Sequence, residues 1–253
     1  MDFPGLEQLS RHFPDLRTPV GQAGVALRAV GFFTLTTLFF LLSDRLIPDW
    51  QPDGQIIIMT VGFLILARFF SQRRSFQARY GDSAYRHAFM RTAIPGLAVI
   101  FAAVAHCAYM PGLPIPELWW KDLLRLLGVY LVLVGTGLWL RAVLTFGVAN
   151  LAMLYVYRPG QSRLVVTGIY GLIRHPIYAS ALRVIAGLCL LNGTWQALVF
   201  AFIAPLGLTG WVRLVEEKEL LKRFPDYRDY RRHVPAFWSL RIYQFWRYLL
   251  SGR

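Results

Sequence analysis

The chain has 253 residues, of which 56% are hydrophobic and only 16% are charged, and its mean hydropathy is +0.43. A soluble domain usually carries about 25% charged residues, so this composition argues against a soluble enzyme and favours an integral membrane protein. The net charge of +13 comes from arginines between apolar blocks, a pattern typical of membrane loops and not of nucleic-acid binding. Cys107 and Cys189 lie inside apolar segments, so neither a disulfide nor a metal site is expected.

Six membrane spans are predicted from the apolar blocks. They are placed at residues 25–43, 56–70, 93–110, 123–146, 176–191 and 194–215. The polar segment at 1–24 is expected to lie at the membrane interface, and because further apolar blocks follow the first one, that block is not a signal peptide. The second and fifth spans have roughly 15 residues, which cover only ~22 Å of a ~30 Å hydrocarbon core. The last hairpin is therefore expected to end inside the outer leaflet.

The loops between the spans predict an orientation. The turn at 44–55 and the loop at 113–122 are poor in basic residues, whereas the connectors at 71–92 and 147–175 and the tail at 216–253 are rich in arginine. By the positive-inside rule, both termini and the arginine-rich loops are expected on the cytoplasmic side. The expected location is a bacterial inner membrane.

The predicted fold class is an all-α polytopic membrane protein with one integral membrane domain over residues 1–253. Residues 1–146 hold the first four spans, and residues 147–253 hold a connector, a helical hairpin and an interfacial tail. Asn192 and Gly193 supply the turn of the hairpin. The last part of the tail, residues 240–250, is amphipathic and is expected to lie in the membrane interface.

Arg174, His175 and Pro176 form a junction between a loop and a helix. A residue before proline is pushed out of the α region, and proline fits the first helical turn. His175 is therefore predicted to lead into the helix with its side chain free to meet a ligand, beside a helix N-terminus that favours an anion. Gly168 and Tyr170, just upstream, add a close-approach loop and an aromatic surface.

Glu216 and Glu217 end the returning helix of the hairpin, so they arrive near the level of His175. Adjacent helical residues point about 100° apart, so the two glutamates are not expected to face the same point. By itself this segment reads as a solvated helix with pairs of opposite charge. Together with Tyr227 and Tyr230, however, the polar groups gather around one membrane hairpin, which favours an active site.

This joint pattern resembles the isoprenylcysteine carboxyl methyltransferase and phospholipid methyltransferase superfamily of integral membrane enzymes. The resemblance covers about residues 168–235, and the earlier chain matches only as generic membrane spans. The matching residues are Gly168, Tyr170, Arg174, His175, Pro176, Tyr178, Glu216, Glu217, Tyr227, Tyr230, Val234 and Pro235.

The resemblance implies S-adenosyl-L-methionine as cofactor and a lipid-like substrate that enters from the bilayer. Displacement at a sulfonium needs alignment and an aromatic or electronegative surround more than a strong acid or base. The implied cofactor-binding residues are Gly168, Tyr170, Arg174, His175, Pro176, Glu216 and Glu217. The implied substrate residues are Tyr178, Arg183, Tyr227 and Tyr230. The candidate catalytic residues are Glu217, His233 and Arg232.

Two positions depart from the family pattern. His233 stands where the carboxyl methyltransferases usually have arginine, although Arg231 and Arg232 adjoin it, which weakens the case for a prenylcysteine carboxylate as acceptor. Arg183 lies two turns into the first arm of the hairpin, where the family is usually apolar. It is expected to snorkel to the interface, to pair with a glutamate or to bind a lipid phosphate. His106, in the third span, is expected to be packed or hydrogen-bonded there.

The predicted function is methyl transfer from S-adenosylmethionine to a lipid-like or prenylated acceptor. The acceptor atom is left open between a carboxylate oxygen, a phospholipid amine and a thiol. One alternative is an NADPH-dependent sterol or steroid reductase, since these enzymes share the Arg-His-Pro motif but usually lack the glutamate pair. Another is a non-catalytic lipid-binding membrane protein. Membrane lipids are the expected partners, nucleic acid is not, and the oligomeric state is open.

Overall fold

The structure, a computed structural model, describes residues 5–47, 49–117, 119–161 and 164–252. Over these residues the chain forms helices, turns and loops and contains no β-strand, which confirms the predicted all-α class. The first four residues of the predicted interfacial segment lie outside the described part of the chain.

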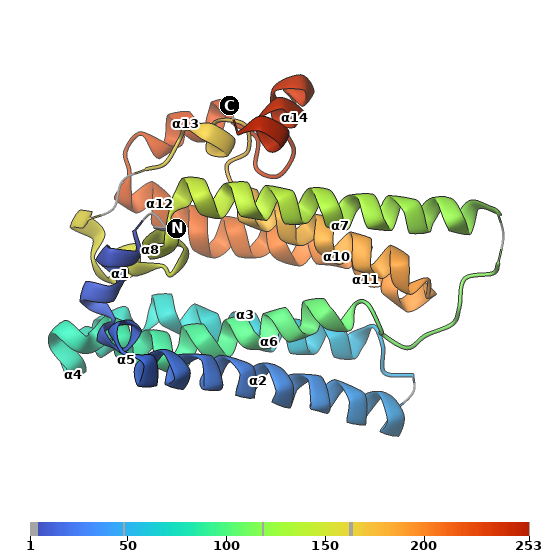
Figure 1. Cartoon of the computed structure of the whole chain (residues 1–253), viewed down its shortest axis with the longest axis horizontal. Coiled ribbons are helices and arrows are strands. Elements are labelled where there is room, and N and C mark those ends of the chain that lie inside the picture. Colours follow the sequence, from blue (N-terminus) through green and yellow to red (C-terminus); the bar gives the residue numbers. More distant parts are fainter. Residues whose placement is uncertain (1–4, 48, 118, 162–163, 253) are drawn as a thin grey trace.

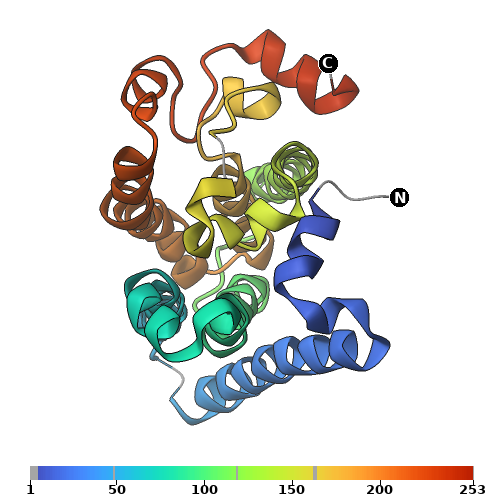
Figure 2. The same ribbon diagram turned by 90° about the vertical axis from the view of Figure 1, so that its left-hand side faces the viewer.

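The long helices lie side by side in two groups (Figures 1 and 2). The N-terminal group consists of α2 (Pro19–Leu46), α3 (Asp53–Ser71) and α6 (Ile94–His106). The C-terminal group consists of α7 (Trp119–Phe146), α10 (Pro176–Asn192) and α11 (Trp195–Trp211). In the first group α6 packs against both α2 and α3, and in the second α10 packs against both α7 and α11.

Five helical segments of the described chain are long and apolar enough to cross a membrane. They are Pro19–Leu46, Asp53–Ser71, Arg73–His106, Trp120–Phe146 and Trp195–Arg223. The remaining predicted span is α10, which has 17 residues and is short, as its sequence predicted. In contrast, α3 is longer than predicted, with 19 residues, because it already begins at Asp53. The structure confirms a polytopic helical membrane protein with about six spans.

The first span begins at Pro19, earlier than the predicted residue 25. The hydroxyl oxygen of Thr18 accepts a hydrogen bond from the backbone N–H of Gly21 at 3.1 Å, and Pro19 occupies the first turn. Both are residues that favour a helix start. The end of the predicted interfacial segment therefore forms the first turns of α2.

Small residues bring α7 and α10 into close contact. A Cβ atom added at Gly187 of α10 would lie 2.7 Å from the carbonyl oxygen of Gly128 on α7, so only glycine fits there. Further along, the Ser180 hydroxyl donates a hydrogen bond to the carbonyl oxygen of Gly135 at 2.8 Å. Close backbone approach through small and hydroxyl residues is typical of helix pairs in membranes. This pairing fixes the helix that begins at the Arg-His-Pro motif.

The N-terminal group buries a histidine at the end where α2 and α6 finish. His106 is fully buried, with Nδ1 2.7 Å from Gln55 Oε1 and Nε2 2.9 Å from Asp44 Oδ2. Its ring stacks on Phe40 with 3.9 Å between the ring centroids. The prediction that His106 is packed and hydrogen-bonded is confirmed.

Short helices gather at the opposite end of the molecule, toward which both termini lie (Figure 1). Before α7 they are α1 (Leu6–His12), η1 (Pro14–Arg17), α4 (Arg73–Tyr80), η2 (Gly81–Ser83), α5 (Ala84–Ala88) and the π-helix η3 (Phe89–Ala93). After α7 they are α8 (Val148–Leu151), α9 (Leu154–Tyr157), η4 (Pro159–Gln161), η5 (Gly168–Gly171), the π-helix η6 (Val212–Glu216), α12 (Glu217–Arg223) and α13 (Tyr227–His233). The cytoplasmic orientation of this end stays a prediction.

The tail ends in α14 (Ile242–Ser251), an amphipathic helix that lies against α7. Phe245 is buried, whereas Ile242 and Tyr243 are exposed. Arg141 of α7 donates hydrogen bonds to the carbonyl oxygens of Leu249 and Leu250, at 3.0 and 3.1 Å. It therefore supplies a basic group to the C-terminal end of α14, where the unpaired carbonyls of a helix favour a cation.

Candidate functional site

The hairpin brings the motifs of the C-terminal half together. His175 has φ −122°, outside the α region, and α10 begins at Pro176, as the sequence predicted. The tail returns to the same place, because the backbone N–H groups of Arg174 and His175 donate to the carbonyl oxygens of Pro235 and Ala236, at 2.9 and 3.0 Å. These two hydrogen bonds fix the Val-Pro segment beside the Arg-His-Pro motif.

Glu217 is the centre of a buried network. Its Oε1 accepts hydrogen bonds from Arg174 Nη2 at 3.1 Å and from the Tyr227 hydroxyl at 3.2 Å, and it lies 3.3 Å from His175 Nε2. Arg231 Nη1 lies 3.4 Å from the other carboxylate oxygen, and the residue as a whole is only 2% exposed. Burial and the neighbouring charge of Glu217 raise the pKa of Tyr227, so its hydroxyl keeps the proton that it donates.

A π-helix ends at the first of the two glutamates, and an α-helix begins at the second. α11 ends at Trp211, η6 runs from Val212 to Glu216, and α12 begins at Glu217. Glu216 stays close to the network, with Oε1 3.8 Å from His175 Nδ1, but its side chain points to a different space from that of Glu217. Single π-helical turns inside α-helices are common at functional sites.

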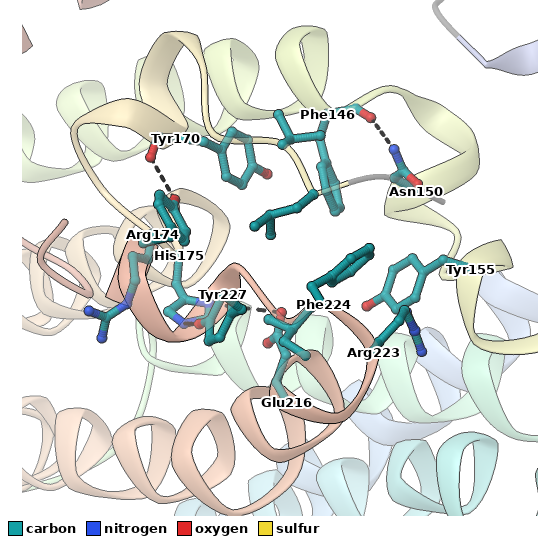
Figure 3. A pocket seen from close by; sticks show the side chains of 14 residues that line it. Phe146, Asn150, Tyr155, Tyr170, Arg174, His175, Glu216, Arg223, Phe224 and Tyr227 are labelled. Carbon is teal, nitrogen blue, oxygen red and sulfur yellow. Dashed lines mark hydrogen bonds and ion pairs between the residues drawn. The ribbon is translucent and has the colours of Figure 1, made fainter. Parts of the chain in front are cut away.

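A cavity with about 500 Å³ of empty space, part of it open to solvent, lies beside this network. Its aromatic lining residues are Phe146, Tyr155, Tyr170, Phe224, Tyr227 and Tyr230. Its polar lining residues are Asn150, Arg174, His175, Glu216 and Arg223. Figure 3 shows aromatic side chains from α7, the connector and the segment after α12 around one space, with Glu216 at its lower edge.

Polar atoms without partners concentrate on this cavity. Within the described residues, four buried side-chain atoms have no hydrogen-bond partner: Tyr170 Oη, Arg174 Nε, Glu216 Oε2 and Arg223 Nη1. All four residues line the cavity. A buried polar atom without a partner costs about 1–3 kcal/mol, so such atoms are rare in isolation and rarer together. The four atoms include both donors and acceptors, so a polar group or water in the cavity would find partners of both kinds.

A second cavity lies on the other side of Glu217, with about 490 Å³ of empty space. It is lined by Arg174, Thr209, Val212, Arg213, Glu217, Arg231, Ala236 and Phe237. Three arginines against one glutamate make this lining basic, and Arg174 belongs to both cavities. The network around Glu217 thus stands between an aromatic cavity and a basic one.

The part of the chain that builds this arrangement matches a known family. Residues 123–226 match the model of the phospholipid methyltransferase family. This segment is similar to the integral membrane methyltransferases of that superfamily. The match contains most of α7, the Arg-His-Pro motif and both glutamates of the hairpin, and it ends one residue before Tyr227. The resemblance identified from the motifs is confirmed.

Two curated relatives match part of the chain. The chain is 31% identical over 110 residues to the nickel-cobalt-cadmium resistance protein NccN of Alcaligenes xylosoxydans xylosoxydans. It is 33% identical over 119 residues to the cobalt-zinc-cadmium resistance protein CzcN of Cupriavidus metallidurans. The matches cover 38% and 45% of this chain and 49% and 47% of the relatives, so the chain spans about half the length of the curated relatives it matches. No solved structure matches the chain significantly.

The structure brings most of the predicted cofactor and substrate residues to the two cavities. Those that line the aromatic cavity are Tyr170, Arg174, His175, Glu216, Tyr227 and Tyr230, and Glu217 lines the basic one. Tyr230 also donates a hydrogen bond to the carbonyl oxygen of Tyr170 at 2.6 Å, which joins the tail to the loop before α10.

Other predicted residues lie outside both linings. Gly168 has φ +60°, and a Cβ atom there would lie 2.7 Å from the Tyr248 hydroxyl, so this glycine lets the loop pass beneath α14. Pro176 is buried at the start of α10, and Tyr178 accepts a hydrogen bond from Trp211 Nε1 at 3.1 Å.

The candidate catalytic residues of the tail are placed differently from Glu217. His233 is exposed, with 72% of its side chain accessible, and its Nδ1 lies 3.0 Å from the carbonyl oxygen of Asp229. Arg232 is also exposed on α13. Neither residue lines either of these two cavities, and neither is among the contacts of Glu217 described above.

Several lining residues carry no motif in the sequence. Phe146 and Asn150 follow the end of α7, Tyr155 lies in α9, and Arg223 and Phe224 end α12. Arg223 pairs with Glu219 at 2.7 Å, as its spacing of four residues predicted, and its guanidinium lies 4.8 Å from the Tyr155 ring centroid. The only sequence signal at these positions was the frequency of aromatic side chains in the arginine-rich connectors and tail.

Proposed function

We propose that this chain is an S-adenosylmethionine-dependent methyltransferase whose acceptor is a lipid-like molecule from the bilayer. The match of residues 123–226 supports a membrane methyltransferase acting on lipid-type substrates. The observation that carries the proposal is the set of four unpaired buried polar atoms on one aromatic-lined cavity.

The cavity fits the chemical groups of this cofactor. The unpaired N–H groups of Arg174 and Arg223 are suited to a carboxylate, as in the amino-acid end of the cofactor. Glu216 Oε2 is an acceptor for an ammonium group or for ribose hydroxyls. The aromatic side chains offer stacking surfaces for an adenine ring and an electronegative surround for a sulfonium cation. When bound, S-adenosylmethionine supplies a methyl group to a lone pair of the acceptor.

The two glutamates have separate roles in this proposal. Glu216 contacts the cofactor, because its free oxygen faces the cavity. Glu217 is a positioning residue, because its carboxylate is already engaged by Arg174, Tyr227 and Arg231 and lies beside His175. It holds the wall between the two cavities so that the cofactor and the acceptor meet in one alignment.

The basic cavity is the place for the headgroup of the acceptor. Arg174, Arg213 and Arg231 attract a phosphate or a carboxylate, and Val212 and Phe237 offer apolar contact for the lipid part. Because Arg174 lines both cavities, a headgroup bound there lies next to the proposed cofactor. The acceptor class is therefore a lipid with an anionic group near the methylated atom.

The direct test is ligand binding to the detergent-solubilised protein by calorimetry. S-adenosylhomocysteine, the product form of the cofactor, should bind and raise the melting temperature, whereas NADPH should do neither. Binding of NADPH without S-adenosylhomocysteine would replace the proposal by a reductase, and binding of neither would favour a non-catalytic lipid-binding protein. If S-adenosylhomocysteine binds, transfer of a radiolabelled methyl group to a lipid extract should identify the acceptor.

A further inference from the structure

Arg183 is a buried cation in the middle of α10. It is only 6% exposed. Its Nη1 donates to the carbonyl oxygen of Ala179 at 2.7 Å, and Nη1 and Nη2 reach the carbonyl oxygen of Phe237 at 3.3 and 3.4 Å. Over the described part of the chain, no carboxylate lies within ion-pair distance of this guanidinium.

One of the three expectations for Arg183 is therefore wrong, because the side chain does not pair with a glutamate. Its guanidinium reaches back toward the start of α10 and the tail and is enclosed there, so snorkelling to the membrane interface stays a prediction. A charge inside a membrane protein is costly without compensation, and such residues commonly mark a binding site or a pathway. The guanidinium contacts two carbonyl oxygens, which carry no net charge, so its positive charge has no anionic partner.

An aromatic side chain covers the guanidinium. The Arg183 guanidinium carbon lies 4.2 Å from the ring centroid of Trp238 and 5.9 Å from that of Phe245. Trp238 is itself 59% exposed and belongs to the irregular segment between α13 and α14. This segment has no helical hydrogen bonds of its own, so the indole is a cover that can swing aside without breaking a helix.

Apolar side chains and one arginine are exposed around the cover. Leu240, Arg241 and Ile242 are exposed beside Trp238 in the chain, and the exposed Tyr130 of α7 packs against Trp246 of α14. Exposed aromatic and aliphatic residues next to a membrane span are typical of contact with the interface of the bilayer. The surface from which Arg183 is reached therefore faces lipid and not bulk water.

We propose that Arg183 binds the phosphate of an anionic membrane lipid, which reaches the guanidinium from the bilayer by displacing the Trp238 indole. A guanidinium presents a planar fork of N–H donors that matches phosphate oxygens, and a phosphate supplies the missing anion. Neither Arg183 nor Trp238 lines either cavity, so the site differs from both, although Phe237, which accepts from Arg183, also lines the basic one.

The test measures lipid binding to the detergent-purified protein by native mass spectrometry. The probes are phosphatidylglycerol and a diacylglycerol with the same acyl chains but no phosphate. Arg183→Gln should weaken phosphatidylglycerol binding by about ten- to a hundredfold, the effect of losing a hydrogen bond to a charged group. Diacylglycerol binding should not change. Arg247→Gln, which removes the same charge from an exposed position of α14, is the matched control and should bind like the parent.

The proposal is overturned if Arg183→Gln binds phosphatidylglycerol like the parent, or if it loses both lipids equally. Millimolar inorganic phosphate should not displace the lipid, and competition would overturn the lipid as the source of the phosphate. Two further variants keep the test decisive if Arg183→Gln fails to fold. Arg183→Lys keeps the charge and should keep the preference for phosphatidylglycerol, and Trp238→Ala uncovers the site and should bind this lipid at least as tightly. Loss of the preference in both variants shows that Arg183 only anchors the tail.

Discussion

Each half of the molecule buries a histidine beside a carboxylate, and the two settings differ in how completely their polar atoms are paired. In the N-terminal helices, His106 lies between Asp44 and Gln55, and the other oxygen of Asp44 accepts from Trp50 Nε1 and Gln51 Nε2. None of these five residues contributes an unpaired buried atom. At the opposite end of the molecule, the surroundings of His175 contain four such atoms.

This difference distinguishes two roles that buried polar side chains can have. A cluster whose donors and acceptors are all satisfied holds helices together, because breaking any contact leaves a polar group unpaired. A cluster that surrounds a cavity with unpaired atoms is completed by groups from outside the chain, such as water, an ion or a ligand. Burial of a histidine is therefore not by itself a sign of function. The three predictions below test the contrast, from the largest expected effect to the smallest.

Glu217→Gln should lower the free energy of unfolding by about 3–5 kcal/mol, because it removes the anion shared by Arg174, His175 and Arg231 from a buried network. Denaturation with SDS in detergent micelles measures this change. The neighbouring variant Glu216→Gln is the control, and its free energy of unfolding should stay within about 0.5 kcal/mol of the parent. Equal stability of the two variants would remove the distinction between a positioning and a ligand-binding glutamate.

Glu216→Gln should instead weaken S-adenosylhomocysteine binding by about 1.5–3 kcal/mol, because it neutralises the oxygen that faces the cavity without a partner. Calorimetry of the folded variant gives this value. His233→Ala is the comparison, since His233 is exposed outside both cavities. The His233→Ala variant should bind S-adenosylhomocysteine with the affinity of the parent. Loss of affinity in His233→Ala but not in Glu216→Gln would mean that the cavity is not the cofactor site.

His106→Ala should lower the free energy of unfolding by about 1–3 kcal/mol, because Asp44 and Gln55 would lose a buried partner. S-adenosylhomocysteine affinity should remain that of the parent, since the two clusters lie at opposite ends of the helices. SDS denaturation and calorimetry on the same preparation measure both quantities. A drop in affinity without a change in stability would show that the N-terminal cluster also serves the ligand, contrary to the comparison.

Much of the fold could be predicted because its signals are local. Long apolar blocks mark the spans, since an isolated helix is the simplest way to satisfy backbone groups in lipid. The Arg-His-Pro junction predicted a helix start at Pro176, and Asn192 and Gly193 predicted the turn that returns the glutamates to His175. The start of α2 was missed, although Thr18 and Pro19 carry the usual residues of a helix start, because polar residues around them obscured the span.

The sequence by itself therefore determined the helical class, the approximate spans, the family resemblance and the gathering of the motif residues at one end of a hairpin. Only the tertiary structure decided which groups face the cavities. The π-helix η6 changes the helical phase just before Glu217, so ideal helix geometry did not assign one glutamate to the cavity and the other to the network. Phe146, Tyr155 and Trp238 reach their places through contacts between segments distant in the chain. Such contacts depend on packing and not on local sequence, which is why the cover over Arg183 had no signal in the sequence.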